Sequence, residues 1–280
     1  MAENGFYAIY ALRRFVARAT QRPRNLLWHL VRRFKLLLGV RVRIAAAERL
    51  SVVLLSYKRP RNIQKILSAV VLCDFVDEIV ISNNNPEVDL GRFISIEDPR
   101  ITLIPQNRRR YPSVRLELSQ KARSHHVLAI DDDIFLEAEQ IRGLFEHLLG
   151  QPAVPHGLGG EIFSASADPT PSTVVYKRRE TPVEALLWMF AYTKDHVRRY
   201  FELLDALGIK NDELVWSEDV PLSFAGLGPP LIHDLGRVHA CPSENEEGVA
   251  TWRNEGFFAH RVELVKRLRE LLHREPPVAA

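Results

Sequence analysis

The chain has 280 residues, of which 46% are hydrophobic and 26% are charged. This length can form one large α/β domain or two small ones, and these fractions exclude a disordered or fibrous protein. No run approaches the roughly 20 apolar residues that span a bilayer, and the N-terminus lacks the pattern of a secretory signal. Cys73 and Cys241 are the two cysteines. A disulfide framework and a cysteine-rich zinc site are therefore excluded, and a reducing, cytoplasmic location is expected.

The N-terminal arm is strongly basic. Residues 1–44 contain ten Lys or Arg and a single acidic residue, so the rest of the chain is mildly acidic. Apolar residues recur in the arm at helical spacing, with basic residues beside them: Leu27, Leu30, Val31, Phe34, Leu37 and Leu38. This pattern predicts a basic amphipathic helix. Such a helix either lies on the cytoplasmic face of an anionic membrane, where each basic residue adds about 1 kcal/mol, or packs its stripe on the body. Nucleic acid is not an expected partner, because no stacking platform or groove-reading motif accompanies the basic residues.

An α/β pattern begins at residue 50. Leu50–Ser56 is a nearly continuous apolar run, which is typical of a strand buried on both faces. We expect further strands at Val76–Ser82, Ile101–Pro105 and His126–Ile130, and helices at Ile63–Val71 and Val114–Ala122. This alternation predicts an α/β fold with a mostly parallel central sheet flanked by helices.

Glycine, proline and serine become frequent after an expected helix at Ile141–Leu149. Beyond it we expect strands at Glu161–Phe163, Thr173–Tyr176 and Ala185–Tyr192, and helices at Asp195–Leu207, after Trp216–Asp219 and at Phe257–His273. We interpret residues 1–49 as the arm and residues 50–280 as one domain, with a nucleotide-binding half (50–150) and an acceptor-side half (151–280).

Polar clusters follow three of the predicted strands: Ser56–Arg59, Asn83–Asn85 and Asp131–Asp133. Ligands of open α/β sheets bind beyond the carboxyl ends of the strands. The three clusters are therefore expected to meet at one ligand site. His233 and His239, by contrast, are interpreted as exposed loop residues and not as ligands.

The aspartate triplet indicates a metal. Side chains alternate along a strand, so Asp131 and Asp133 are expected to share a face from which Asp132 points away. Two carboxylates a few ångströms apart repel by about 4 kcal/mol at an effective dielectric constant near 20. A hard divalent cation, Mn²⁺ or Mg²⁺, reverses this repulsion. The alternative is a solvated acidic turn.

Six motifs together resemble a known family. They are Ser56-Tyr57-Lys58-Arg59, Ile81-Ser82-Asn83-Asn84, Asn107-Arg108-Arg109-Arg110, Asp131-Asp132-Asp133, Ser217–Phe224, and Thr251-Trp252-Arg253 followed by Ala259-His260-Arg261. In this order they are similar to exostosin-like glycosyltransferases (glycosyltransferase family 64, GT-A fold), over residues 50–272. The resemblance implies Mn²⁺, with Mg²⁺ possible, and a UDP-sugar donor. It also implies retaining transfer of a hexosyl, hexosaminyl or glucuronyl group to a glycan or glycolipid.

The resemblance also implies a role for each matching residue. The uracil end of the donor would be held by Ser56, Tyr57 and Arg59, with Asn83 or Asn84 and Asn107 beside them. The nucleotide or its phosphates would contact Arg110, the ribose and donor sugar would contact Asp131 and Asp132, and the metal would be bound by Asp133 with help from Asp131. As catalytic residues, Asp219 would face the reacting sugar and Arg261 would stabilise the departing diphosphate.

Two differences from the family pattern bear on which donor and acceptor are used more than on the class of reaction. The acid pair of the family is Asp-Asp, whereas this chain has Glu218-Asp219, and the arginine-rich segment is spaced differently before Leu116. Two alternatives stay open. One is an inverting GT-A enzyme with Asp219 as general base, and the other is a non-catalytic adaptor that works at a membrane surface.

Overall fold

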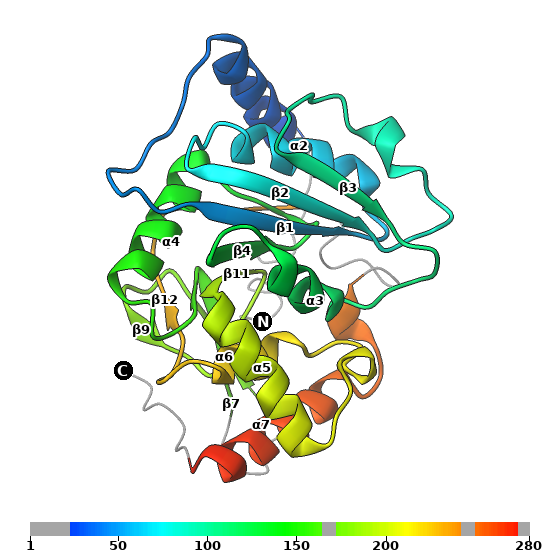
Figure 1. Ribbon diagram of the computed structural model, residues 1–280, viewed down its shortest axis with the longest axis vertical. Coiled ribbons are helices and arrows are strands. Elements are labelled where there is room, and N and C mark those ends of the chain that lie inside the picture. The colour runs from blue at the N-terminus through cyan, green and yellow to red at the C-terminus, as the bar shows by residue number, and fades with distance from the viewer. Residues whose placement is uncertain (1–22, 164–171, 242–249, 274–280) are drawn as a thin grey trace, which may run out of the picture.

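The computed structural model describes residues 23–163, 172–241 and 250–273 (Figure 1). The first half of the basic arm, residues 1–22, lies outside the described residues. Among the residues that are described, no helix has both the length and the apolarity needed to cross a bilayer.

A central sheet of eight strands organises the molecule, in the order β3-β2-β1-β4-β11-β6-β12-β9. Its strands are β1 (Leu50–Ser56), β2 (Val76–Asn83), β3 (Ile101–Pro105), β4 (His126–Ile130), β6 (His156–Gly157), β9 (Thr181–Pro182), β11 (Met189–Thr193) and β12 (Leu231–Ile232). The four strands β3, β2, β1 and β4 are all parallel, and β11 is antiparallel to β4. The predicted fold class is confirmed, and the parallel strands β1 to β4 match their predicted ranges within one residue.

Both faces of β1 are buried, as its apolar run predicts. Leu50, Val52 and Leu54 belong to one core, with α2 (Pro60–Val70) and α4 (Ala138–Gly150). Val53 and Leu55 belong to a second core on the other face. That second core includes residues of α3 (Val114–Lys121), α5 (Lys194–Leu207), α6 (Asp219–Phe224) and α7 (Phe257–Leu272). Figure 1 shows α2 and α3 on opposite sides of the sheet.

Two smaller sheets and three short 3₁₀ helices complete the described fold. One sheet has the order β10-β7-β8, and the other pairs β13 with β5. Their strands are β5 (Ile134–Phe135), β7 (Gly159–Phe163), β8 (Ser172–Tyr176), β10 (Ala185–Leu186) and β13 (His239–Ala240), and the 3₁₀ helices are η1 (Leu90–Phe93), η2 (Asn211–Glu213) and η4 (Thr251–Arg253).

The predicted single strand Ala185–Tyr192 is wrong. The chain crosses from the three-stranded sheet to the central sheet between β10 and β11, because Trp188 adopts a left-handed backbone conformation with φ of 69°. Gly159 lies against the Trp188 ring, where any Cβ would collide with it. The Trp188 carbonyl accepts a hydrogen bond of 2.9 Å from the backbone N–H of Asp131. The crossover therefore also supports the start of the aspartate triplet.

Residues 23–37 form the predicted amphipathic helix, but its apolar stripe faces outward. The buried side chains are instead Asn25, Trp28 and Arg32. Trp28 stacks on Phe135 with ring centroids 5.6 Å apart and donates a hydrogen bond to Glu137, which also pairs with Arg32. The alternative in which the stripe packs on the body is therefore wrong for the described residues.

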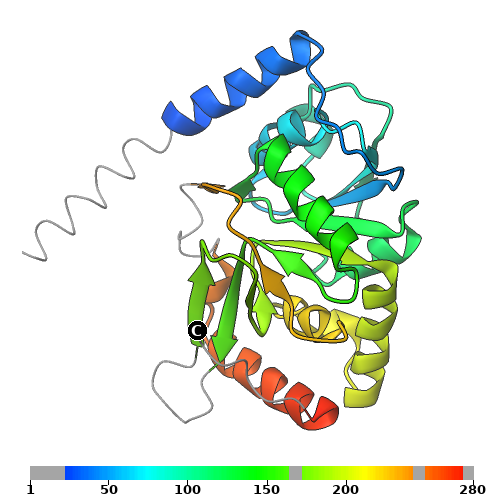
Figure 2. The ribbon, with the colours of Figure 1, turned by 90° about the vertical axis from the view of Figure 1, so that its left-hand side faces the viewer.

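The stripe residues are strongly exposed. The exposed fractions of Leu27, Phe34 and Leu37 are 63%, 62% and 83%. Figure 2 shows this helix along the outer margin of the molecule. The helix packs through Trp28 and Arg32 because they contact the Phe135 ring and the Glu137 carboxylate.

Candidate active site

A cavity of about 820 Å³ opens beyond the carboxyl ends of β1, β2 and β4. It is walled on the opposite side by residues from β7, from the start of α6 and from α7. Of the predicted site residues, the cavity is lined by Tyr57, Arg59, Asn84, Arg110, Asp131, Asp132, Asp133, Asp219 and Arg261. The structure thus brings together residues that are up to about 200 positions apart in the chain.

The three aspartates form a turn between β4 and β5, not the end of a strand. Arg59 donates a hydrogen bond of 2.8 Å to Asp132, and its guanidinium lies 3.2 Å from Asp133. Asp131 instead accepts a bond of 2.7 Å from Arg115. The expected alternation of faces is therefore wrong. β4 ends at Ile130, and the turn that follows directs both Asp132 and Asp133 toward the Arg59 guanidinium. Burial raises the pKa of Asp132, and Arg59 opposes that effect.

The donor set of this turn fits a hard divalent cation. Three carboxylates line one wall of the cavity, and carboxylate oxygens are the ligands that Mn²⁺ and Mg²⁺ prefer. The guanidinium of Arg59 already lies beside two of these carboxylates, so the turn accommodates positive charge. The predicted metal residues Asp131 and Asp133 both belong to this wall.

Tyr57 presents an aromatic surface to the cavity. The Arg109 guanidinium lies 4.6 Å from the centre of the Tyr57 ring, and the Lys58 ammonium lies 5.5 Å from it. Arg109 also lies 5.4 Å from the Tyr111 ring centre. Arg109 lines the cavity, although the arginine-rich motif predicts no separate role for it.

Three of the residues predicted to hold the nucleotide do not line the cavity. Ser56 is buried, and its carbonyl accepts a hydrogen bond of 2.8 Å from the Asn84 backbone. Asn83 donates its side-chain amide to the Val88 carbonyl at 2.6 Å and so shapes the turn after β2. Asn107 is exposed outside the cavity. These residues lie beside the site, where Ser56 and Asn83 fix the backbone that carries Asn84.

Arg110 lines the cavity, but acidic side chains already contact it. It donates to both oxygens of Glu117 at 2.7 and 2.8 Å, and it lies 3.4 Å from Asp212. Its charge is therefore largely balanced within the protein.

Asp219 and Arg261 meet in a buried ion-pair network. Arg261 is 1% exposed and donates to Asp219 at 2.7 Å. Its Nε and Nη2 donate to one oxygen of Glu161 at 3.1 and 2.8 Å, while Ser172 donates to the other. Burial lowers the pKa of Arg261, but the two carboxylates more than offset it, so the pKa is raised. Arg261 is therefore not part of a solvated helix face. Glu161 carries no local sequence signal that marks it as the partner.

A second buried arginine lies across the cavity. Arg115 contacts Asp131, and its Nε lies 3.2 Å from Glu218. Its Nη1 is buried and has no hydrogen-bond partner among the described residues. Burial raises the pKa of Glu218 to about 7, with Arg115 opposing the rise and Asp219 and Asp131 adding to it. Glu218 stands where the family pattern has Asp, and Arg115 carries no local sequence signal that marks it as a site residue.

One sequence family and several solved structures resemble the chain. Residues 50–148 match the model of the glycosyl transferase family 64 domain. No curated protein sequence matches the chain. The crystal structure of GalNAc-T7 with UDP, GalNAc and Mn²⁺ is similar, with a TM-score of 0.52 and 13% identity over 71% of this chain and 44% of that one. S. aureus TarS 1–349 has a TM-score of 0.50 and 13% identity over 79% of this chain and 65% of that one.

This chain therefore spans less than half of the first structure and under two thirds of the second. At 13% identity the likeness shows the fold alone, which is GT-A. The family match and the fold confirm the predicted resemblance.

Proposed function

We propose that the chain is a metal-dependent glycosyltransferase, because residues 50–148 match the glycosyl transferase family 64 domain and the fold is GT-A. It would move a sugar from a UDP-sugar to a glycan or glycolipid acceptor with retention of configuration. The observation that carries the proposal is the single cavity shared by the aspartate turn, Tyr57 and the buried pair of Asp219 and Arg261.

The nucleotide end of the donor would lie against Tyr57. The aromatic ring and the Arg109 guanidinium, 4.6 Å from its centre, suit the face of a uracil ring. Arg115 lines the same cavity, and its unpartnered Nη1 suits a phosphate oxygen. Arg109 and Arg115 supplement Arg110, whose charge Glu117 already balances.

The metal would be held by Asp133 with Asp131, and Asp132 lies in the same turn. When bound, a divalent cation offsets the negative charge of a leaving diphosphate. Arg261 lines the same cavity, where two carboxylates hold it in a fixed position and balance its charge. Fixed N–H donors aimed at the atoms where charge develops are an effective form of transition-state stabilisation.

The pairing of Asp219 supports retention. A general base for an inverting reaction must accept the proton of the acceptor hydroxyl. Asp219 already accepts a hydrogen bond from the buried Arg261 at 2.7 Å. This contact supports a role in positioning the reacting sugar and Arg261 rather than in proton abstraction.

The exposed stripe of the arm helix supports peripheral contact with an anionic membrane. Leu27, Phe34 and Leu37 are exposed, and the exposed Arg33 and Arg41 lie beside them in the chain. An apolar face with basic neighbours complements acyl chains below anionic headgroups. We place the enzyme on the cytoplasmic face, where a glycolipid acceptor would be within reach.

Turnover tests the proposal directly. Purified protein is incubated with individual UDP-sugars and Mn²⁺, and released UDP is measured with and without EDTA. We expect Mn²⁺-dependent UDP release with at least one donor, and NMR of the transferred sugar should show the anomeric configuration of the donor. Net inversion would reject the retaining assignment. The adaptor alternative would be favoured if no donor turned over and UDP bound equally with and without metal.

A further inference from the structure

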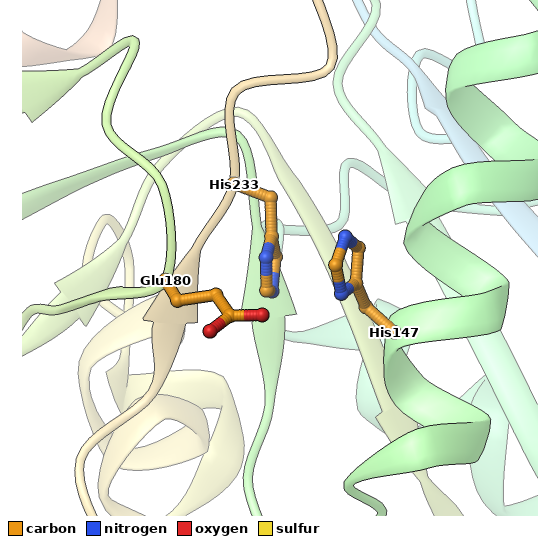
Figure 3. A group of neighbouring side chains, drawn as sticks. All are labelled: His147, Glu180 and His233. Atoms are coloured by element: carbon orange, nitrogen blue, oxygen red, sulfur yellow. The ribbon is translucent and has the colours of Figure 1, made fainter.

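Two histidines and a glutamate converge at the sheet edge that is formed by β6, β12 and β9. His147 lies near the end of α4, Glu180 precedes β9, and His233 follows β12. Their potential ligand atoms all lie within 4.8 Å of one another (Figure 3). None of the three lines the cavity of the candidate active site, so this cluster is separate from the aspartate turn.

His233 is buried, contrary to its interpretation as an exposed loop residue; its exposed fraction is 3%. The rings of His147 and His233 are stacked, with centroids 3.6 Å apart and planes inclined by 14°. Figure 3 shows the Glu180 carboxylate next to the edges of both rings. The His156 ring also packs against His233, with ring centroids 5.1 Å apart.

A chain of hydrogen bonds fixes which nitrogen of His233 faces the cluster. Nε2 of His156 lies 2.9 Å from the Gln151 carbonyl, which can only accept, so Nε2 carries the proton. Nδ1 of a neutral His156 is then an acceptor, and it lies 2.8 Å from Nε2 of His233. The His233 proton must therefore reside on Nε2. The lone pair of His233 is left on Nδ1, without a hydrogen-bond partner among the described residues.

We propose that His147, Glu180 and His233 bind a divalent transition-metal ion, and the ligand chemistry assigns Zn²⁺. Two neutral imidazoles and one carboxylate suit Zn²⁺ better than Mg²⁺ or Ca²⁺, which prefer oxygen ligands alone. The Gln151–His156–His233 chain is the outer-shell arrangement that orients a metal-binding histidine. A fourth position would be left for water.

Binding requires a modest local rearrangement. The in-plane lone pairs of the stacked His147 and His233 rings run nearly parallel, so they cannot both point at one ion about 2.0–2.1 Å away. His147 is half-buried and Glu180 is exposed, so both have room to move, whereas His233 is buried and held by His156. His147 would rotate off its stack while His233 stays in place. The ion would then link α4, the segment before β9 and the segment after β12.

Zinc binding by the full-length chain, freed of metal with a chelator, tests the proposal. We expect isothermal titration calorimetry to give one tight Zn²⁺ site in the Asp133→Ala background, where the aspartate turn contributes little. Glu180→Gln and His147→Ala should abolish that site, and Co²⁺ should show the visible absorption of a tetrahedral ion only when all three ligands are present. His125→Ala is the matched control, because His125 is exposed and lies 3.7 Å from a carboxylate, that of Asp195. It should bind Zn²⁺ like the parent.

His156, which contacts His233 but is not a proposed ligand, gives a second test. A cluster that is only structural would not respond to its replacement in this way. His156→Ala should weaken Zn²⁺ binding by about 10–100-fold without removing a ligand. Zn²⁺ should also raise the melting temperature of the parent protein, and not that of Glu180→Gln. The proposal is overturned if the parent binds no Zn²⁺, or if Glu180→Gln and His147→Ala bind it as tightly as the parent. It does not depend on the proposed glycosyl transfer, since neither outcome involves UDP.

Discussion

Arg261 of α7 and Asp219 of α6 form a 2.7 Å ion pair that is almost completely buried. The two residues come from separate sequence motifs, 42 positions apart. Glu161 closes the network from β7, so the arginine is held by two carboxylates from two other elements. The pair is thus both a wall of the cavity and a link between α6, α7 and the three-stranded sheet.

Removing Arg261 should destabilise the protein strongly. Arg261→Ala leaves the carboxylates of Asp219 and Glu161 buried without their cation, which costs about 3–5 kcal/mol in comparable pairs. Urea unfolding measures the free energy of unfolding. The control is Arg198→Ala, which removes an exposed pair with Glu202 of similar length and should leave the free energy of unfolding nearly unchanged. Equal costs for the two variants would contradict the buried-network account.

Asp133→Ala should abolish metal-dependent UDP binding while the protein stays folded. The change removes a proposed metal ligand, and it leaves Asp132 to pair with Arg59. UDP affinity is measured by calorimetry with Mn²⁺ and with EDTA, and circular dichroism checks the fold. Asp205→Ala, on an exposed position of α5, should bind UDP like the parent. Retained Mn²⁺-dependent binding in Asp133→Ala would contradict the ligand assignment.

Glu218→Gln should change how stability depends on pH. The pKa of Glu218 is raised from 4.5 to about 7 in the folded protein. Between these values the folded state keeps a proton that the unfolded chain has released, so the free energy of unfolding falls as pH rises from 4.5 to 7 and is unaffected by this group above 7. The contribution is at most about 3 kcal/mol.

The difference between parent and Glu218→Gln isolates this contribution. His196 and His233 have pKa values lowered to about 4 and about 3, so their effect runs the other way: stability is lost as pH falls below 6.5. Both histidines are present in both proteins and cancel. Urea unfolding is measured in EDTA from pH 4.5 to 8. As pH rises from 4.5 to 7, the free energy of unfolding should fall more for the parent than for the variant. Parallel curves would show that Glu218 is charged throughout.

Replacing the exposed stripe of the arm helix should release the protein from anionic vesicles. Leu27→Ser, Phe34→Ser and Leu37→Ser together remove apolar area that already faces solvent, so folding should be unaffected. Co-sedimentation with phosphatidylserine vesicles should fall at least about tenfold. The control is Leu227→Ser, another exposed leucine outside the helix. Unchanged sedimentation would reject membrane contact, and a dimer that only the triple variant disrupts would assign the stripe to a second copy.

The parallel half of the sheet was predictable because its signals are local. β1, β2 and β4 are short, largely apolar runs that end in polar clusters, and each of the three clusters places at least one residue in the cavity as expected. The break between β10 and β11 was not predictable. Leu186, Leu187 and Trp188 continue an apolar run, and only the packing of Trp188 against Gly159 reveals the crossover.

Local sequence also does not predict which residues pair with the site residues. Glu161 and Arg115 became site residues only when the fold set Glu161 against Arg261 and Arg115 against Asp131. Periodicity located the apolar stripe of the arm correctly, but the packed side was determined by Phe135 and Glu137, more than a hundred residues later in the chain.

One crossover residue joins the two halves of the molecule mechanically. The Trp188 carbonyl holds the backbone of Asp131, and its ring rests on Gly159 of the three-stranded sheet. The same residue thus touches the three-stranded sheet with its ring and the aspartate turn with its carbonyl. We expect a substitution at Trp188 to disturb both the packing on Gly159 and the backbone position of Asp131.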